Sequence, residues 1–134
     1  MSAKLYDFSI EQGSSFRLSL TYKDSDGVII DLTGYCARLV MKIGSNEYKT
    51  FSTLNNDYSE YKFTLNGPSG NITLLIPASS TNNYSFNSAK YDLELQSPSD
   101  LYNGGGKYTI RVLYGTITLV KRFSQSNTLL DCSP

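Results

Sequence analysis

The sequence predicts an all-β fold, an antiparallel immunoglobulin-like β-sandwich of about eight or nine strands with no substantial helix. Apolar residues recur at every second position in several segments, turn signals follow one another roughly every 8 to 12 residues, and no segment has a helical period. The composition agrees, since 11 Tyr and 6 Phe residues accompany abundant Ser, Thr, Asn and Gly. We therefore expect one domain over residues 1–134, with extended N- and C-terminal arms.

The N-terminal strands are predicted by apolar residues that alternate with polar ones. Residues 6–10 form such a run, and Gly13 then breaks it, as a chain that turns a corner into its next strand requires. The DSDG sequence at residues 24–27 reverses the chain after that next strand. This strand is the clearest of all, and the residues expected on its core face are Phe16, Leu18, Leu20 and Tyr22.

The next predicted hairpin follows the DLTG sequence of residues 31–34, which interrupts the alternation and is interpreted as a connection. The GSNE sequence at residues 44–47 then joins two strands, residues 36–43 and 48–53. The residues expected to point inward from the first of them are Ala37, Leu39, Met41 and Ile43.

Another hairpin is predicted around the NGPSG turn of residues 66–70. Pro77 ends its second strand, and residues 78–88 form a crossing loop with about one helical turn, because they are too polar for a core strand. The side chains expected to face one another across this hairpin are Tyr61, Phe63 and Leu65 on one strand and Ile72, Leu74 and Ile76 on the other.

The C-terminal half ends in two long strands, residues 89–96 and 108–123, with a flexible loop between them. The alternation in the last strand slips at Gly115, which predicts a bulge or bend there. The NSAKYDL sequence around Tyr91 resembles the tyrosine corner of immunoglobulin-like sandwiches, in which the hydroxyl bonds to backbone of the preceding loop. The alternative is that Tyr91 is one more half-buried aromatic residue of a strand.

Composition excludes several classes of function. Twelve basic and twelve acidic residues cancel, without long runs of one sign, so nucleic acid and anionic membranes are not expected partners. The sequence has no apolar run long enough to span a membrane, and its start lacks the pattern of a secretory signal, so we expect synthesis in the cytoplasm. Histidine is absent, which removes the usual general base and zinc ligand, and Cys36 and Cys132 are expected to be reduced thiols. No cofactor or metal is expected.

Two groups of acidic residues are candidates for a metal site or a catalytic pair. Asp24 and Asp26 begin like a calcium-binding loop, but only Asp31 follows, so a plain turn is the preferred interpretation. Asp92 and Glu94 lie two residues apart, about 7 Å along one strand, within the range of a glycosidase pair. Their neighbours occupy the core face, so a solvated charged stripe is preferred over catalysis.

Apolar and aromatic residues in predicted loops are the candidates for a protein interface. Tyrosines expected to be exposed there could stack on sugars or dock a protein, and the apolar C-terminal segment could dock onto its own sheet or onto a neighbour. The tyrosines are Tyr58, Tyr84 and Tyr102, and the apolar candidates are Leu101, Leu129 and Leu130.

Residues 8–42, with an aromatic strand, a QG corner, a DxDG turn and the sequence DLTGYxAR, resemble small structural proteins of tailed bacteriophages. The sequences GNITLLIPASST, AKYDLELQSPSD and RVLYGTITL resemble the second half of the same proteins. The resemblance implies a virion or tail-associated protein, similar in some members to the N-terminal baseplate-anchoring domains of receptor-binding proteins, and it brings no catalytic residues. The longer SPSDLYNGGGKYTIR segment departs from the pattern and leaves the local interface open.

The predicted function is therefore that of a non-enzymatic virion structural protein, an adaptor in the tail, baseplate or fibre attachment region. Its expected partners are other virion proteins and copies of itself, without nucleic acid or membrane. The alternative is a carbohydrate or host-surface binding module that uses its loop tyrosines.

Overall fold

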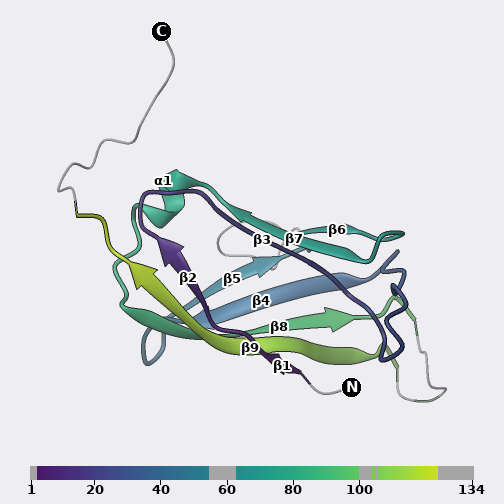
Figure 1. Cartoon of the computed structure of the whole chain (residues 1–134). Coiled ribbons are helices and arrows are strands. Elements are labelled where there is room, and N and C mark those ends of the chain that lie inside the picture. Colours follow the sequence, from purple (N-terminus) through teal and green to yellow (C-terminus); the bar gives the residue numbers. More distant parts are fainter. Residues whose placement is uncertain (1–2, 55–62, 100–103, 105, 124–134) are drawn as a thin grey trace, which may run out of the picture.

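The computed structural model describes residues 3–54, 63–99, 104 and 106–123. These residues form two β-sheets that pack face to face (Figure 1). The larger sheet has the strand order β1-β9-β8-β4-β5, with β2 also paired to β9. Its strands are β1 (Lys4–Leu5), β2 (Phe8–Glu11), β4 (Cys36–Lys42), β5 (Tyr48–Ser52), β8 (Ser88–Gln96) and β9 (Thr109–Val120).

The smaller sheet has the order β3-β7-β6. Its strands are β3 (Phe16–Thr21), β7 (Asn71–Ile76) and β6 (Thr64–Asn66). The order β9-β8-β4-β5 corresponds to strands G, F, C and C′ of an immunoglobulin-like sandwich, and β3-β7-β6 corresponds to B, E and D. The predicted fold class is therefore confirmed. The single helical turn expected in the crossing loop is also confirmed, as α1 (Ala78–Thr81).

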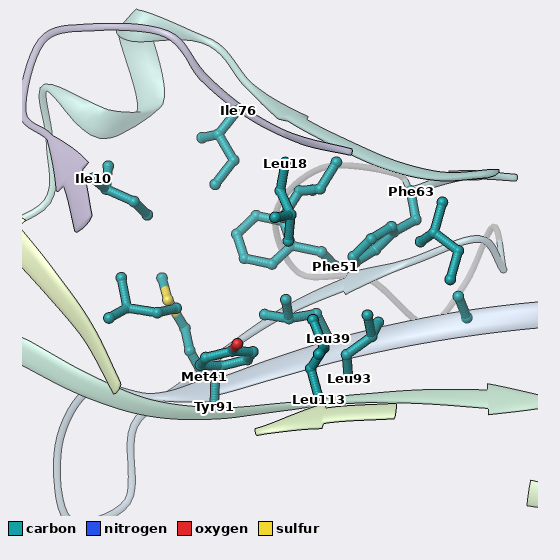
Figure 2. Close-up of a cluster of buried hydrophobic side chains, with 14 of the residues drawn as sticks. Ile10, Leu18, Leu39, Met41, Phe51, Phe63, Ile76, Tyr91, Leu93 and Leu113 are labelled. Carbon is teal, nitrogen blue, oxygen red and sulfur yellow. The ribbon is translucent and has the colours of Figure 1, made fainter. Parts of the chain in front are cut away.

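The core lies between the sheets because each strand points every second side chain inward. In Figure 2, Leu39, Leu93 and Leu113 of the larger sheet face Leu18 and Ile76 of the smaller sheet. Leu39 and Leu93 are completely buried. Burying a leucine of this kind stabilises a fold by about 1.5–3 kcal/mol. Burial of the side chains that the alternation identifies therefore supplies the main driving force for folding.

The observed register confirms the turns of both predicted hairpins, whereas Tyr61 of the second hairpin lies outside the described residues. Lys42 pairs with Tyr48 across the GSNE turn, and Leu65 pairs with Ile72 across the NGPSG turn. Strand β3 pairs antiparallel with β7 over its whole length. Among the described residues, no helix is long and apolar enough to cross a membrane.

The N-terminal strands differ from the prediction of a wholly antiparallel fold. Both β1 and β2 run parallel to β9. In the ABED sheet of an immunoglobulin constant-type domain, the first strand lies beside strand B, which corresponds to β3 here. Because β1 and β2 pair with the other sheet instead, β3 is an edge strand of the smaller sheet as far as the chain is described.

The expected bulge at Gly115 is wrong in position. The register between β8 and β9 shifts between Leu93 and Glu94, which pair with Leu113 and Arg111, so the extra residue is Val112. Gly115 instead permits the N-terminal chain to approach closely. A Cβ atom there would lie 2.7 Å from Asp7 Oδ1 and would also overlap the carbonyl oxygen of Tyr6.

The chain between β1 and β2 is fixed at this point by three hydrogen bonds. The backbone N–H of Tyr6 donates to the carbonyl of Tyr114 at 2.9 Å, and the N–H of Thr116 donates to Asp7 Oδ1 at 2.8 Å. The hydroxyl of Tyr91 donates to the carbonyl oxygen of Tyr6 at 2.5 Å. These bonds hold the N-terminal segment on β9 at the place where Gly115 leaves room for it.

The prediction of a tyrosine corner is wrong, because the hydroxyl of Tyr91 bonds to the backbone of the N-terminal segment and not to that of the preceding loop. Tyr91 is only 4% exposed, and its ring packs edge-on against Phe8 at 5.1 Å between centroids. Burial raises the pKa of the Tyr91 hydroxyl, so this group remains a hydrogen-bond donor at neutral pH.

We expect Gly115→Ala to lower the free energy of unfolding by about 1–3 kcal/mol, because the added methyl group forces the Tyr6–Asp7 backbone away from β9. Urea unfolding measures this loss. Gly44→Ala is the matched control, since its Cβ would meet its nearest neighbour at 3.4 Å, an ordinary contact. Equal stabilities of the two variants would contradict the close approach at Gly115.

Candidate functional site

The acidic residues of the DSDG turn organise the turn itself. Oδ1 of Asp24 accepts hydrogen bonds from the backbone N–H groups of Asp26 and Val28, both at 2.9 Å. The backbone N–H of Asp24 also donates to the carbonyl of Val28 at 2.9 Å. The preferred interpretation as a turn is confirmed for Asp24, since its carboxylate holds the loop closed.

Asp31 has the same local role in the DLTG connection. Its Oδ1 accepts hydrogen bonds from the backbone N–H of Thr33 at 2.9 Å and from the Thr33 hydroxyl at 2.6 Å. These two bonds lower the pKa of Asp31. The adjacent Leu32 is 1% exposed, and its N–H donates to the carbonyl of Gly67 at 2.8 Å, so the connection is anchored in the core. Within the described part of the chain, no three potential metal ligands of the Asp, Glu, Cys or His type lie together.

Asp92 and Glu94 lie half-buried on the outer face of the larger sheet, as the alternation predicts. Glu94 forms an ion pair with Arg38 on the neighbouring strand β4, at 3.5 Å. Burial raises the pKa of Asp92, and the nearby charge of Glu94 raises it further, while Arg111 and Arg38 act in the opposite direction. Both acids therefore belong to a network of charges across the sheet.

The prediction that Tyr84 is exposed is wrong. Its side chain is 3% exposed, and its ring lies 5.6 Å from that of Phe86. The chain after α1 is drawn against the end of the sandwich, because the Gln12 side chain donates to the Tyr84 carbonyl at 2.8 Å. The hydroxyl of Thr81 in α1 also donates to the Ser14 carbonyl at 2.8 Å. Tyr84 is therefore a core residue, although its neighbours in the sequence are polar.

The remaining interface candidates lie outside the described residues, and they are Tyr58, Leu101, Tyr102, Leu129 and Leu130. Cys132 is also outside the described part of the chain, in which Cys36 is a free thiol.

An apolar groove that the sequence did not reveal lies between β1 and β3. Its hollow has a volume of about 600 Å³ and is lined by side chains of both sheets. Leu5 and Tyr6 on the β1 side are 61% and 46% exposed. The alternation of β3 identified its inward side chains, but only the pairing of the N-terminal strands leaves the groove open. We call this hollow the β1–β3 groove.

The outer face of the larger sheet contains a second hollow, of about 650 Å³. Tyr48 lies on the β5 side and Tyr114 on β9, with Val40 and Asp92 of the two intervening strands between them. The tyrosines are 54% and 37% exposed. The arrangement combines aromatic walls with a partly charged floor, which can hold a small polar ligand.

Comparisons with known proteins leave the chain without an assigned family. No protein-family model matches the sequence, and no curated protein matches it. The two surfaces described above, an apolar groove at a sheet edge and a shallow hollow with tyrosines, are therefore the structural basis for inferring a function.

We expect Asp92→Asn to raise the melting temperature at pH 7. The pKa of Asp92 is raised on folding, so its charged form destabilises the folded state as pH rises above the ordinary pKa of 3.8. The increase in melting temperature caused by Asp92→Asn should therefore vanish at lower pH. Thermal unfolding between pH 3 and pH 7 is the measurement, with exposed Asp26→Asn as control. A lower melting temperature of Asp92→Asn at pH 7 would mean that attraction to the arginines dominates.

Proposed function

We propose that the chain is a non-enzymatic structural protein of a bacteriophage virion, an adaptor in the tail, baseplate or fibre attachment region. The observation that carries this proposal is the edge strand β3, which borders an apolar groove with exposed side chains on its opposite side. The sequence resemblance of residues 8–42 to small tail-associated proteins points in the same direction. Its partners would be other virion proteins and copies of itself.

Unpaired sheet edges favour association with another chain, because their backbone N–H and C=O groups can continue the sheet. Further exposed apolar residues lie in the segment that follows the DSDG turn, since Val28 and Ile29 are 60% and 48% exposed. Ile29 forms an isolated antiparallel bridge with Lys23, immediately after β3. Apolar exposure of this kind is typical of a surface that is covered in an assembly.

The charges of the chain also suit an assembly with many copies. The formal net charge is zero, so neighbouring copies would not repel one another strongly. The acidic pair on β8 supports a structural role over hydrolysis, because Glu94 is paired with Arg38 and the sheet face is open to water. Leu129 and Leu130 would add an apolar anchor from the C-terminal arm.

Mass spectrometry of purified phage particles tests the proposal most directly, since an adaptor must be present in them. We expect the double change Leu129→Ser and Leu130→Ser to reduce incorporation at least tenfold without changing the melting temperature. Two buried leucines contribute about 1.5–3 kcal/mol each, and about 1.4 kcal/mol is tenfold in affinity.

Leu54→Ser is the control for that experiment, because Leu54 is 51% exposed and lies outside the groove. It should leave incorporation unchanged. Absence of the unaltered protein from purified particles would contradict the virion role itself.

The second candidate function is a carbohydrate or host-surface binding module. Tyr84 cannot serve it because its side chain is buried, but the hollow between Tyr48 and Tyr114 favours it. Lys42 and Lys90 pair directly across β4 and β8 in this hollow, which adds hydrogen-bond donors between the aromatic walls. A sugar ring could stack on a tyrosine while its hydroxyl groups bond to the floor.

If this second function holds, Tyr48→Ala and Tyr114→Ala should each weaken binding to host cells or their surface polysaccharides at least tenfold. The measurement is binding of the labelled protein to intact cells. Tyr108→Ala is the control, because Tyr108 is 37% exposed, as Tyr114 is, but does not line the hollow. Unchanged cell binding together with failed particle assembly would favour the adaptor.

A further inference from the structure

We infer that the β1–β3 groove accepts an extended β-strand from a neighbouring protein chain, with apolar residues at alternate positions and acidic residues between them. This inference rests on the proposed adaptor function and specifies the chemistry of its partner. The strand would pair with the free edge of β3 and insert its apolar side chains between the two sheets. It would occupy the side of β3 on which no strand of the described chain lies.

The backbone of β3 has hydrogen-bonding groups directed to that side. The N–H of Tyr22 donates to the carbonyl of Gly70 at 2.8 Å, and the register continues from this pair along β3 and β7. Backbone groups of successive residues in a strand point to opposite sides, so Leu18 and Leu20 face β7. The N–H and C=O groups of Arg17, Ser19 and Thr21 therefore face away from β7, toward the groove edge.

The floor of the groove is apolar and has the spacing of a strand. Leu18, Leu20 and Tyr22 line it at every second position of the chain, and Val112 of β9 lines it from the larger sheet. Alternate side chains of an added strand would lie between these residues, because strands have the same repeat of two residues. An apolar residue at every second position is therefore required of the partner.

The groove has a defined closed end near the start of β3. The rings of Phe8 and Phe16 stack there, with 5.1 Å between centroids and 12° between planes. This stack fills the space between the sheets beside β2, whereas the groove extends along the part of β3 that begins at Leu18. The added strand would therefore pair with the C-terminal part of β3 and not with its first residue.

The charged side chains beside the groove determine which residues of the partner strand fit between its apolar residues. Arg17 and Lys23 occupy alternate, outward-facing positions of β3 and the residues after it, and Lys4 lines the opposite side of the groove. One acid, Asp24, also lines the groove, and its Oδ1 accepts two backbone hydrogen bonds within its own turn. Outward-facing side chains of an added strand would lie beside Arg17 and Lys23, where acidic residues form favourable cross-strand pairs.

The test uses the full chain and an eight-residue peptide of alternating Val and Glu, with binding followed by NMR titration. We expect shifts at Ser19, Thr21 and Leu5, and at least tenfold weaker binding of a peptide of alternating Val and Lys. Leu5→Glu should weaken binding of the Val–Glu peptide at least tenfold, whereas Leu75→Glu should not. Leu75 is a matched control, since it is 54% exposed on the outer face of β7.

Two methylated peptides test whether the backbone takes part in binding. One has N-methyl groups on its Glu residues and the other on its Val residues, so each removes the N–H groups of one strand edge. If the peptide pairs with β3, one of the two methylated peptides should lose binding while the other still binds. Which of the two loses binding reports the direction of the added strand relative to β3. Equal binding of both, or no binding of the parent peptide, would overturn the inference.

The inference and the proposed function can fail separately. If the peptide does not bind but the protein is found in purified particles, the strand-addition site is wrong and the adaptor function stands. If the peptide binds at β3 but the protein is absent from particles, the site stands and the virion function is wrong.

Discussion

Parallel pairing of the N-terminal residues with β9 is the constraint on which the surfaces of this protein depend. It joins the first and last described strands of the chain, and it is fixed where the Tyr6–Asp7 backbone passes over Gly115. The Tyr91 hydroxyl secures the same point from within the core. Because the N-terminal strands are held on the larger sheet, β3 is the last strand of the smaller sheet on that side among the described residues.

The remaining features of that side follow from this arrangement. Where the chain turns from β2 into β3, the stacked Phe8 and Phe16 close the gap between the sheets. Beyond them, no strand of the described residues covers the inward side chains of β3, and the β1–β3 groove results. The Asp24 carboxylate accepts two backbone hydrogen bonds of its own turn, and the positive side chains of Lys4 and Lys23 line the groove. The apolar hollow and the open backbone edge thus have one structural cause.

Most of the fold could be predicted from the sequence, because alternation identifies which side chains of a strand face the core. The alternation correctly predicts that Leu18, Leu39 and Leu74 are core residues. Alternation does not identify the neighbour of a strand, so the parallel pairing of β1 and β2 was missed. The alternation around Gly115 predicts a bulge in its own strand. The role of Gly115 depends instead on the Tyr6–Asp7 segment, more than a hundred residues earlier in the sequence. Tyr84 was misplaced because its polar neighbours indicate a loop but not which side chain that loop buries.

The central claim is that β3 pairs with no described strand on one side because the N-terminal strands lie on β9, and amide hydrogen exchange along β3 tests it most directly. Exchange rates of backbone amides report which N–H groups are hydrogen-bonded. The account requires an alternation, with slow exchange at Leu18 and Leu20, whose N–H groups face β7, and fast exchange at Ser19 and Thr21. Uniformly slow exchange at all four residues in the isolated protein would show that another strand already covers this edge, and would contradict the account.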